Sequence, residues 1–117
     1  MFKILDKSHD DVFGVEAIGK LEDADYKEIT PLVEKIIETH GHIKFLIQLE
    51  DFKGWTIHAA FDDMRLGLKH HGDIAKFALV GNKHWEEVCS KCASLFVKGE
   101  VKYYDVADVD AAWEWIE

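Results

Sequence analysis

The side chains best suited to chemistry in this sequence are two cysteines, seven histidines and a threonine near the expected start of a helix. Cys89 and Cys92 have the C-x-x-C spacing of redox pairs. Such pairs usually begin a helix, where the helix N-terminus lowers the thiol pKa. Here both cysteines fall inside the apolar stripe of a helix expected over residues 83–97, so we interpret them as small core residues. Free thiols are typical of a reducing compartment.

The histidines and acidic residues do not form the pattern of a metal site. The sequence contains no H-x-x-x-H or H-E-x-x-H motif, and two cysteines do not complete a tetrahedral zinc site. His58 and Asp62 share a polar flank of an expected helix but have no further ligand at a fixed spacing. No glycine-rich phosphate loop follows a predicted strand. We therefore expect no metal and no cofactor. Since no nucleophile–base pair is visible, we also expect no enzymatic activity.

Thr56 lies in the stretch EDFKGWTIHAAFDDM (50–64), which predicts the end of a strand, a turn at Gly54 and the first turns of a helix. In that setting Thr56 is expected to cap the helix, its hydroxyl accepting a backbone N–H bond. The alternative is a phosphoacceptor, because a phosphate at a helix N-terminus is stabilised by the helix dipole and Lys53 lies close by. Two acidic residues just before it oppose that role, so capping is our preferred interpretation.

The helix expected over 56–69 carries two apolar stripes. The first has the spacing of a sheet-facing side and consists of Ile57, Ala60, Phe61, Met64 and Leu68. The second falls on nearly the opposite side and consists of Trp55, Ala59 and Leu66. A helix that covers one sheet needs only one such stripe. The second therefore meets either a neighbouring helix of the same domain or a partner or ligand.

Phe52 stands beside this second stripe, at the expected strand-to-helix turn. Ligands of α/β folds bind at the carboxyl ends of parallel strands. We therefore expect a shallow apolar binding surface at this turn, formed by Phe52, Trp55, Thr56, Ala59 and Leu66. Trp115, which falls off the stripe of its own helix, is a second candidate for an exposed contact.

The expected elements alternate along the chain. Short apolar segments predict strands at 2–5, 12–20, 43–49, 74–81 and 100–105. Helical periodicity predicts helices at 23–40, 56–69 and 83–97, and a last one lined by Val109, Ala112, Trp113 and Ile116. The order β-β-α-β-α-β-α-β-α predicts an α/β fold, a mostly parallel mixed sheet with an N-terminal antiparallel hairpin. We expect one domain, residues 1–117.

Pro31 interrupts the first expected helix. Either Thr30 caps a new helix with Pro31 at its first position, or one longer helix kinks there. Gly41 is expected to end the helix.

The charge of the chain restricts its partners. Of 117 residues, 14 are Lys or Arg and 23 are Asp or Glu, giving a net charge of −9. Such a protein repels phosphate backbones, so nucleic acids and anionic membranes are not expected partners. No apolar segment has the length of a signal peptide or a membrane span. We expect a soluble, cytoplasmic protein.

Several segments together resemble the SpoIIAA-like family of small bacterial proteins. They are GKLEDADY (19–26), DFKGWT (51–56), GLKHHGD (67–73), VGNKHW (80–85) and LFVKGEVKYYD (95–105). The resemblance covers nearly the whole chain. It implies a STAS-type fold, the fold of anti-sigma-factor antagonists and of the cytoplasmic tails of sulfate transporters. It also implies a non-enzymatic binding or regulatory domain that contacts another protein or a second copy of itself, as a homodimer.

Two details refine this implication. In antagonists of this type, an Asp-Ser pair starts the helix after the third strand, and that serine is phosphorylated. The corresponding stretch here is KGWTIHAA, in which Thr56 is the nearest hydroxyl, so the switch serine is not retained. The family is also grouped by fold with CRAL-TRIO lipid-exchange domains. This grouping implies the alternative of a small carrier or sensor of an apolar, lipid-like ligand at the same strand-to-helix turn.

Overall fold

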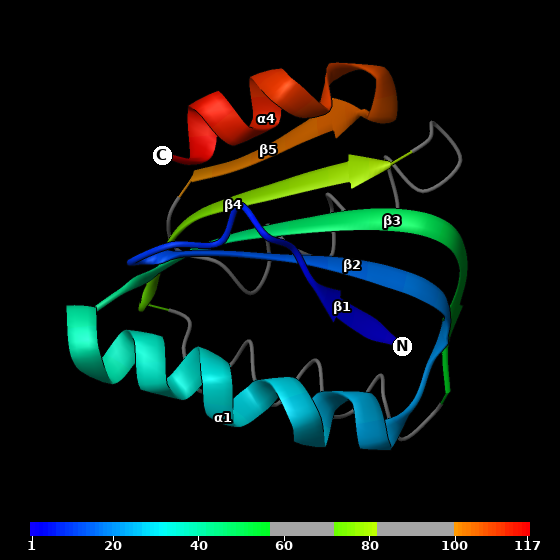
Figure 1. Ribbon diagram of the computed structural model, residues 1–117, viewed down its shortest axis with the longest axis horizontal. Coiled ribbons are helices and arrows are strands. Elements are labelled where there is room, and N and C mark those ends of the chain that lie inside the picture. Colours follow the sequence, from blue (N-terminus) through cyan, green and yellow to red (C-terminus); the bar gives the residue numbers. More distant parts are fainter. Residues whose placement is uncertain (57–71, 82–99) are drawn as a thin grey trace.

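The computed structural model describes residues 1–56, 72–81 and 100–117, with the backbone alone for 51–55. In this part of the chain, five strands form one sheet in the order β1-β2-β3-β4-β5. The strands are β1 (Phe2–Ile4), β2 (Val12–Leu21), β3 (Ile43–Trp55), β4 (Ile74–Gly81) and β5 (Glu100–Asp105). The described helices are α1 (Asp23–His40), the 3-10 helix η1 (Val106–Asp108) and α4 (Val109–Ile116). Figure 1 shows their arrangement.

The strand directions confirm the predicted fold class. β1 pairs with β2 antiparallel, and β2, β3, β4 and β5 pair in parallel. The described elements follow the order expected from the sequence. Apart from Thr56, the helix expected over 56–69 lies outside the described residues, as does the helix expected over 83–97 with its C-x-x-C segment. Within the described part, no helix combines the length and apolar character needed to cross a membrane.

The ends of α1 follow from local hydrogen bonding. At its start, the Asp25 carboxylate accepts a bond from the Glu22 backbone N–H at 2.8 Å, an arrangement that satisfies a donor which the helix leaves unpaired. The helix runs through Pro31 as one element, so a new helix beginning there is wrong. It ends as predicted at Gly41, whose φ of 80° and N–H bond to the Ile37 carbonyl form a left-handed cap.

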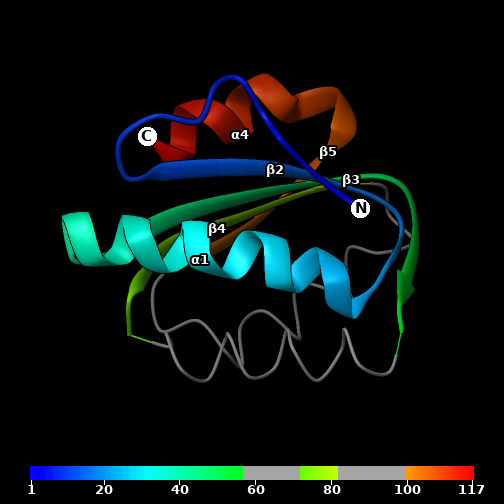
Figure 2. The same cartoon turned by 60° about the horizontal axis from the view of Figure 1, so that its bottom comes forward.

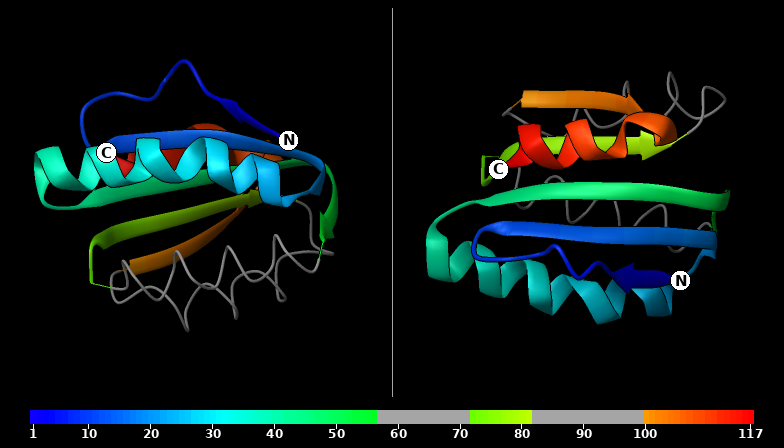
Figure 3. Two further views of the ribbon diagram at one scale, coloured as in Figure 1. Left: turned by 90° about the horizontal axis from the view of Figure 1, so that it is seen from below. Right: turned by 45° about the horizontal axis from the view of Figure 1, so that its top comes forward.

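Two helices cover opposite faces of the sheet, α1 on one side and α4 on the other, as Figures 2 and 3 show from several directions. Strand alternation directs side chains to both layers. On the α1 side, Phe13, Phe45 and Phe77 occupy matching positions of β2, β3 and β4, and their rings are 5.6 and 5.8 Å apart. On the α4 side, Trp113 lies over Gly14 of β2, which has no side chain to obstruct the ring.

Trp115 is half-buried, so the prediction that it forms an exposed contact is wrong. Its ring packs 6.4 Å from Tyr104 of β5. The ammonium groups of Lys76 and Lys102 lie 5.2 and 5.5 Å from its centre. Long lysine side chains shield an aromatic ring while keeping their charge in water. Helical spacing could not reveal this contact, because the lysines come from the sheet below.

Candidate functional site

Two strands extend beyond the rest of the sheet. The parallel pairing of β3 with β4 ends where Gln48 faces Val80. The pairing of β3 with β2 continues to Lys20 opposite Gly54 and Leu21 opposite Trp55. We call residues 18–21 of β2 and 50–55 of β3 the β2–β3 extension. Figure 1 shows both strands curving away from the end of β4.

A bulge produces this curvature. Between Ile18 and Lys20, β2 advances by two residues, whereas the facing stretch of β3 runs from Glu50 to Gly54. Gly19 has a φ of 65°, a conformation that costs glycine little and other residues more. Extra residues on one strand bend it and increase its twist, and bulges are common beside functional sites.

The turn predicted at Gly54 is wrong, because the bulge is followed by further strand pairing. The chain does not reverse there, because Gly54 and Trp55 pair with β2, and the strand ends only at Trp55. Phe52 therefore lies within the bulge and Trp55 within a paired strand. An acidic, glycine-containing segment has the composition of a turn, but its pairing with β2 keeps it extended.

The structure brings three of the five predicted site residues to this end of the sheet. The backbone of Phe52 and Trp55 lies in the β2–β3 extension. Thr56 follows directly, is half-buried, and donates its backbone N–H to the Leu21 carbonyl at 2.8 Å. Ala59 and Leu66, and with them the second apolar stripe, lie outside the described residues. The capping or phosphoacceptor role of Thr56 stays a prediction.

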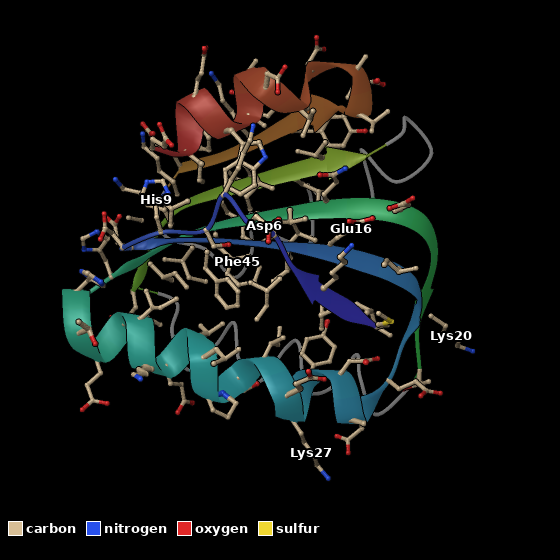
Figure 4. The ribbon with its side chains drawn as sticks, in the orientation of Figure 1. Asp6, His9, Glu16, Lys20, Lys27 and Phe45 are labelled. Carbon is tan, nitrogen blue, oxygen red and sulfur yellow. The ribbon has the colours of Figure 1, made fainter. Side chains whose placement is uncertain are left out.

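A buried carboxylate lies on the α4 side of the sheet, just before the β2–β3 extension. Glu16 of β2 is only 9 % exposed. It pairs in register with Lys3 of β1 and Gln48 of β3, so the three side chains share one face. Figure 4 shows Glu16 over the central strands, between β1 and α4. The sequence motifs do not single out Glu16, although the alternation of VFGVEAIGK (12–20) predicts that it lies on the same face as Gly14.

A second polar cluster lies at the opposite end of the sheet, where the parallel strands begin. The Asp11 carboxylate accepts a bond from the His42 ring at 2.6 Å and lies 3.5 Å from the Lys44 ammonium. Lys44 also donates to the Glu117 carbonyl at 2.9 Å. Lys76 donates likewise to the Trp115 carbonyl at 2.9 Å. The two lysines thus bind the last carbonyls of α4, where cations are favoured.

This cluster changes the acidity of Asp11. Partial burial alone would raise the pKa of Asp11, but the hydrogen bond from His42 and the positive charge of Lys44 outweigh it. The pKa of Asp11 is therefore lowered. Because the same contacts join the starts of β2 and β3 to the end of α4, we infer that the cluster is structural.

We expect Asp11→Asn to lower the free energy of unfolding at pH 7 by about 1 kcal/mol, since it removes a charge-assisted bond in a partly exposed site. A carboxylate with a lowered folded-state pKa stabilises fully above its unfolded pKa of about 4. This contribution is lost as the pH falls through the lowered value. The difference between the two proteins should therefore shrink as the pH falls below about 4 and disappear once the pH lies below the lowered pKa of Asp11.

Urea unfolding at pH 7 and at low pH measures this difference. Asp6→Asn, at an exposed position of the same N-terminal segment, serves as the control with equal charge change. A loss for Asp11→Asn that persisted at low pH would show that packing, and not the ion pairs, is responsible.

Comparison with known proteins agrees with the fold. The family model described as SpoIIAA-like matches residues 12–117. A crystal structure of an uncharacterized protein with a SpoIIAA-like fold from Shewanella loihica PV-4 superimposes with a TM-score of 0.81. The two sequences are 32% identical, over 100% of this chain and 93% of the other. No curated protein matches the chain. Both similarities confirm the resemblance deduced from the motifs, and the chain belongs to the SpoIIAA-like family.

Proposed function

We propose that this protein is a non-enzymatic binding domain that contacts another protein through the β2–β3 extension. One observation carries the proposal. Beyond Gln48, no described strand pairs with the edge of β3 that faces away from β2. An unpaired strand edge presents backbone N–H and C=O groups to which a partner can bind. The same segment carries Phe52 and Trp55, and aromatic residues are enriched in the energetic centres of protein interfaces.

The polar groups in the described part support a binding role over a catalytic one. Asp11, His42 and Lys44 are engaged in contacts that join β2, β3 and α4. The net charge of −9 favours a partner with a basic surface. We place this function in a single domain in the cytoplasm, as the sequence predicts. A second copy of the chain remains one of the partners that the proposal includes.

A Trp55→Ala variant tests this function. Tagged protein is purified gently from its native host, and bound proteins are identified and quantified by mass spectrometry. We expect Trp55→Ala to reduce recovery of the specific partner, or of the second copy, by about tenfold or more, the usual effect of losing an aromatic hot spot. Leu32→Ala, at a 38% exposed apolar position of α1, should recover the partner normally.

Equal recovery with Trp55→Ala and wild-type protein would contradict the proposal, provided that circular dichroism shows both proteins folded. Native mass spectrometry of the same samples would detect a bound small molecule. A bound apolar small molecule, with no partner protein, would replace the proposal with the carrier alternative.

A further inference from the structure

The burial of Glu16 is unusual for its residue type. It is the one charged residue that is buried in the part of the chain that the structure describes. A carboxylate removed from water is unfavourable unless charges or hydrogen-bond donors compensate it. Within the described residues, no hydrogen bond or ion pair reaches the Glu16 side chain. Lys3 of β1, which faces Glu16 in the sheet register, is exposed and forms no ion pair with the Glu16 carboxylate in this structure.

The surroundings of Glu16 differ on its two sides. Two residues before Glu16, on the same face of β2, Gly14 is covered by the Trp113 ring. Two residues after Glu16, the half-buried Ile18 lies on the same face and pairs with the exposed Glu50 of β3. Glu16 therefore stands where the layer formed by α4 meets the exposed part of the sheet. An ion pair formed beside an apolar layer is screened less by water than one on an open surface.

We propose that Glu16 binds a cationic side chain, an arginine or a lysine, of the protein partner. This inference rests on the proposed function and names the chemistry of the partner. An ionised carboxylate only accepts hydrogen bonds, so its ligand must donate them, and a guanidinium can do so with two parallel bonds. Glu50 adds a second negative charge on this face. The net charge of −9 attracts a basic segment over a longer range.

A metal ion fits this position less well. The described residues contain no group of three or more histidine, cysteine or acidic side chains that could hold one. The neighbours of Glu16 in the register, Lys3 and Gln48, supply no second carboxylate, whereas a hard metal cation needs several oxygen ligands. A basic side chain delivered by the partner needs only the one carboxylate.

Binding of N-acetyl-arginine methylamide, followed by NMR on 15N-labelled protein, tests the proposal. We expect saturable shifts of backbone amides in β2 and β3 around Glu16 and Gln48. Glu16→Gln should weaken this binding by about tenfold, the effect of losing one charge-assisted pair. Glu28→Gln, at an exposed position of α1, makes the same charge change and should bind as the wild type does. The neutral isostere N-acetyl-citrulline methylamide should not produce the shifts.

Several results would overturn the proposal. They are the absence of saturable shifts in the wild type, equal binding by Glu16→Gln, and equal shifts with the citrulline compound. Thermal unfolding provides a second measurement, because removing a buried charge should leave Glu16→Gln at least as stable as the wild type. Loss of partner recovery with Trp55→Ala alone would keep the proposed function while rejecting this role of Glu16.

Discussion

Trp113→Ala is expected to lower the free energy of unfolding by about 3–5 kcal/mol, as loss of a buried tryptophan usually does. The side chain is 6% exposed and belongs to the apolar cluster between α4 and the sheet. A domain of this length is stable by roughly 6–18 kcal/mol, so the variant should lose a large share of its stability. Urea unfolding at pH 7 measures the loss.

Gly14 provides the matched test of this contact. A Cβ atom placed there would overlap ring atom Cη2 of Trp113 and lie 2.9 Å from Cζ2. Gly14→Ala should therefore cost about 1–3 kcal/mol through overpacking. In the Trp113→Ala background the same change should cost little, because the ring is gone. Additive losses in this double-mutant cycle would contradict the packing of Trp113 on Gly14.

Phe45→Ala is expected to lower the free energy of unfolding by a similar amount, about 3–5 kcal/mol. Phe45 is 6% exposed on the central strand, between Phe13 and Phe77, on the face covered by α1. Its removal leaves a cavity and breaks two ring contacts at once. Figure 4 shows the Phe45 ring between the sheet and α1.

Two further variants define the source of this loss. Phe45→Leu keeps most of the apolar volume and should cost clearly less than Phe45→Ala. Leu32→Ala, on the exposed side of α1, should change the free energy of unfolding by no more than about 0.5 kcal/mol. A small effect of Phe45→Ala in the same urea titrations would mean that the aromatic row is not part of the core.

Most of the fold could be predicted from local patterns. Alternation in β2, the continuous apolar runs of β3 and β4, and the apolar stripes of α1 and α4 all match the observed elements. These patterns are visible in the sequence because each helix or strand buries one or both of its faces against another layer. Gly41 ends α1 as expected, since a residue with positive φ is needed there.

The features that were missed depend on contacts between distant segments. The extended conformation of Gly54 requires pairing with Lys20, and the half-buried state of Trp115 requires Lys76 and Tyr104 beneath it. The sequence of β2 alone does not distinguish Glu16 from an exposed polar residue of an alternating strand, because its burial depends on the distant elements β1 and α4. No local pattern could predict these contacts. Phe52 and Trp55 therefore lie near the carboxyl end of β3 as expected, but in a paired strand and not in a turn, and their role in binding stays a prediction.

Site-specific photo-cross-linking in the native host tests most directly whether the β2–β3 extension contacts a protein. A photoreactive phenylalanine analogue replaces Phe52 in one variant and Lys27, an exposed residue of α1, in the other. We predict that position 52 forms one discrete cross-linked product with a protein partner or a second copy, whereas position 27 does not. Equal labelling from both positions, or no protein product from position 52, would contradict the account.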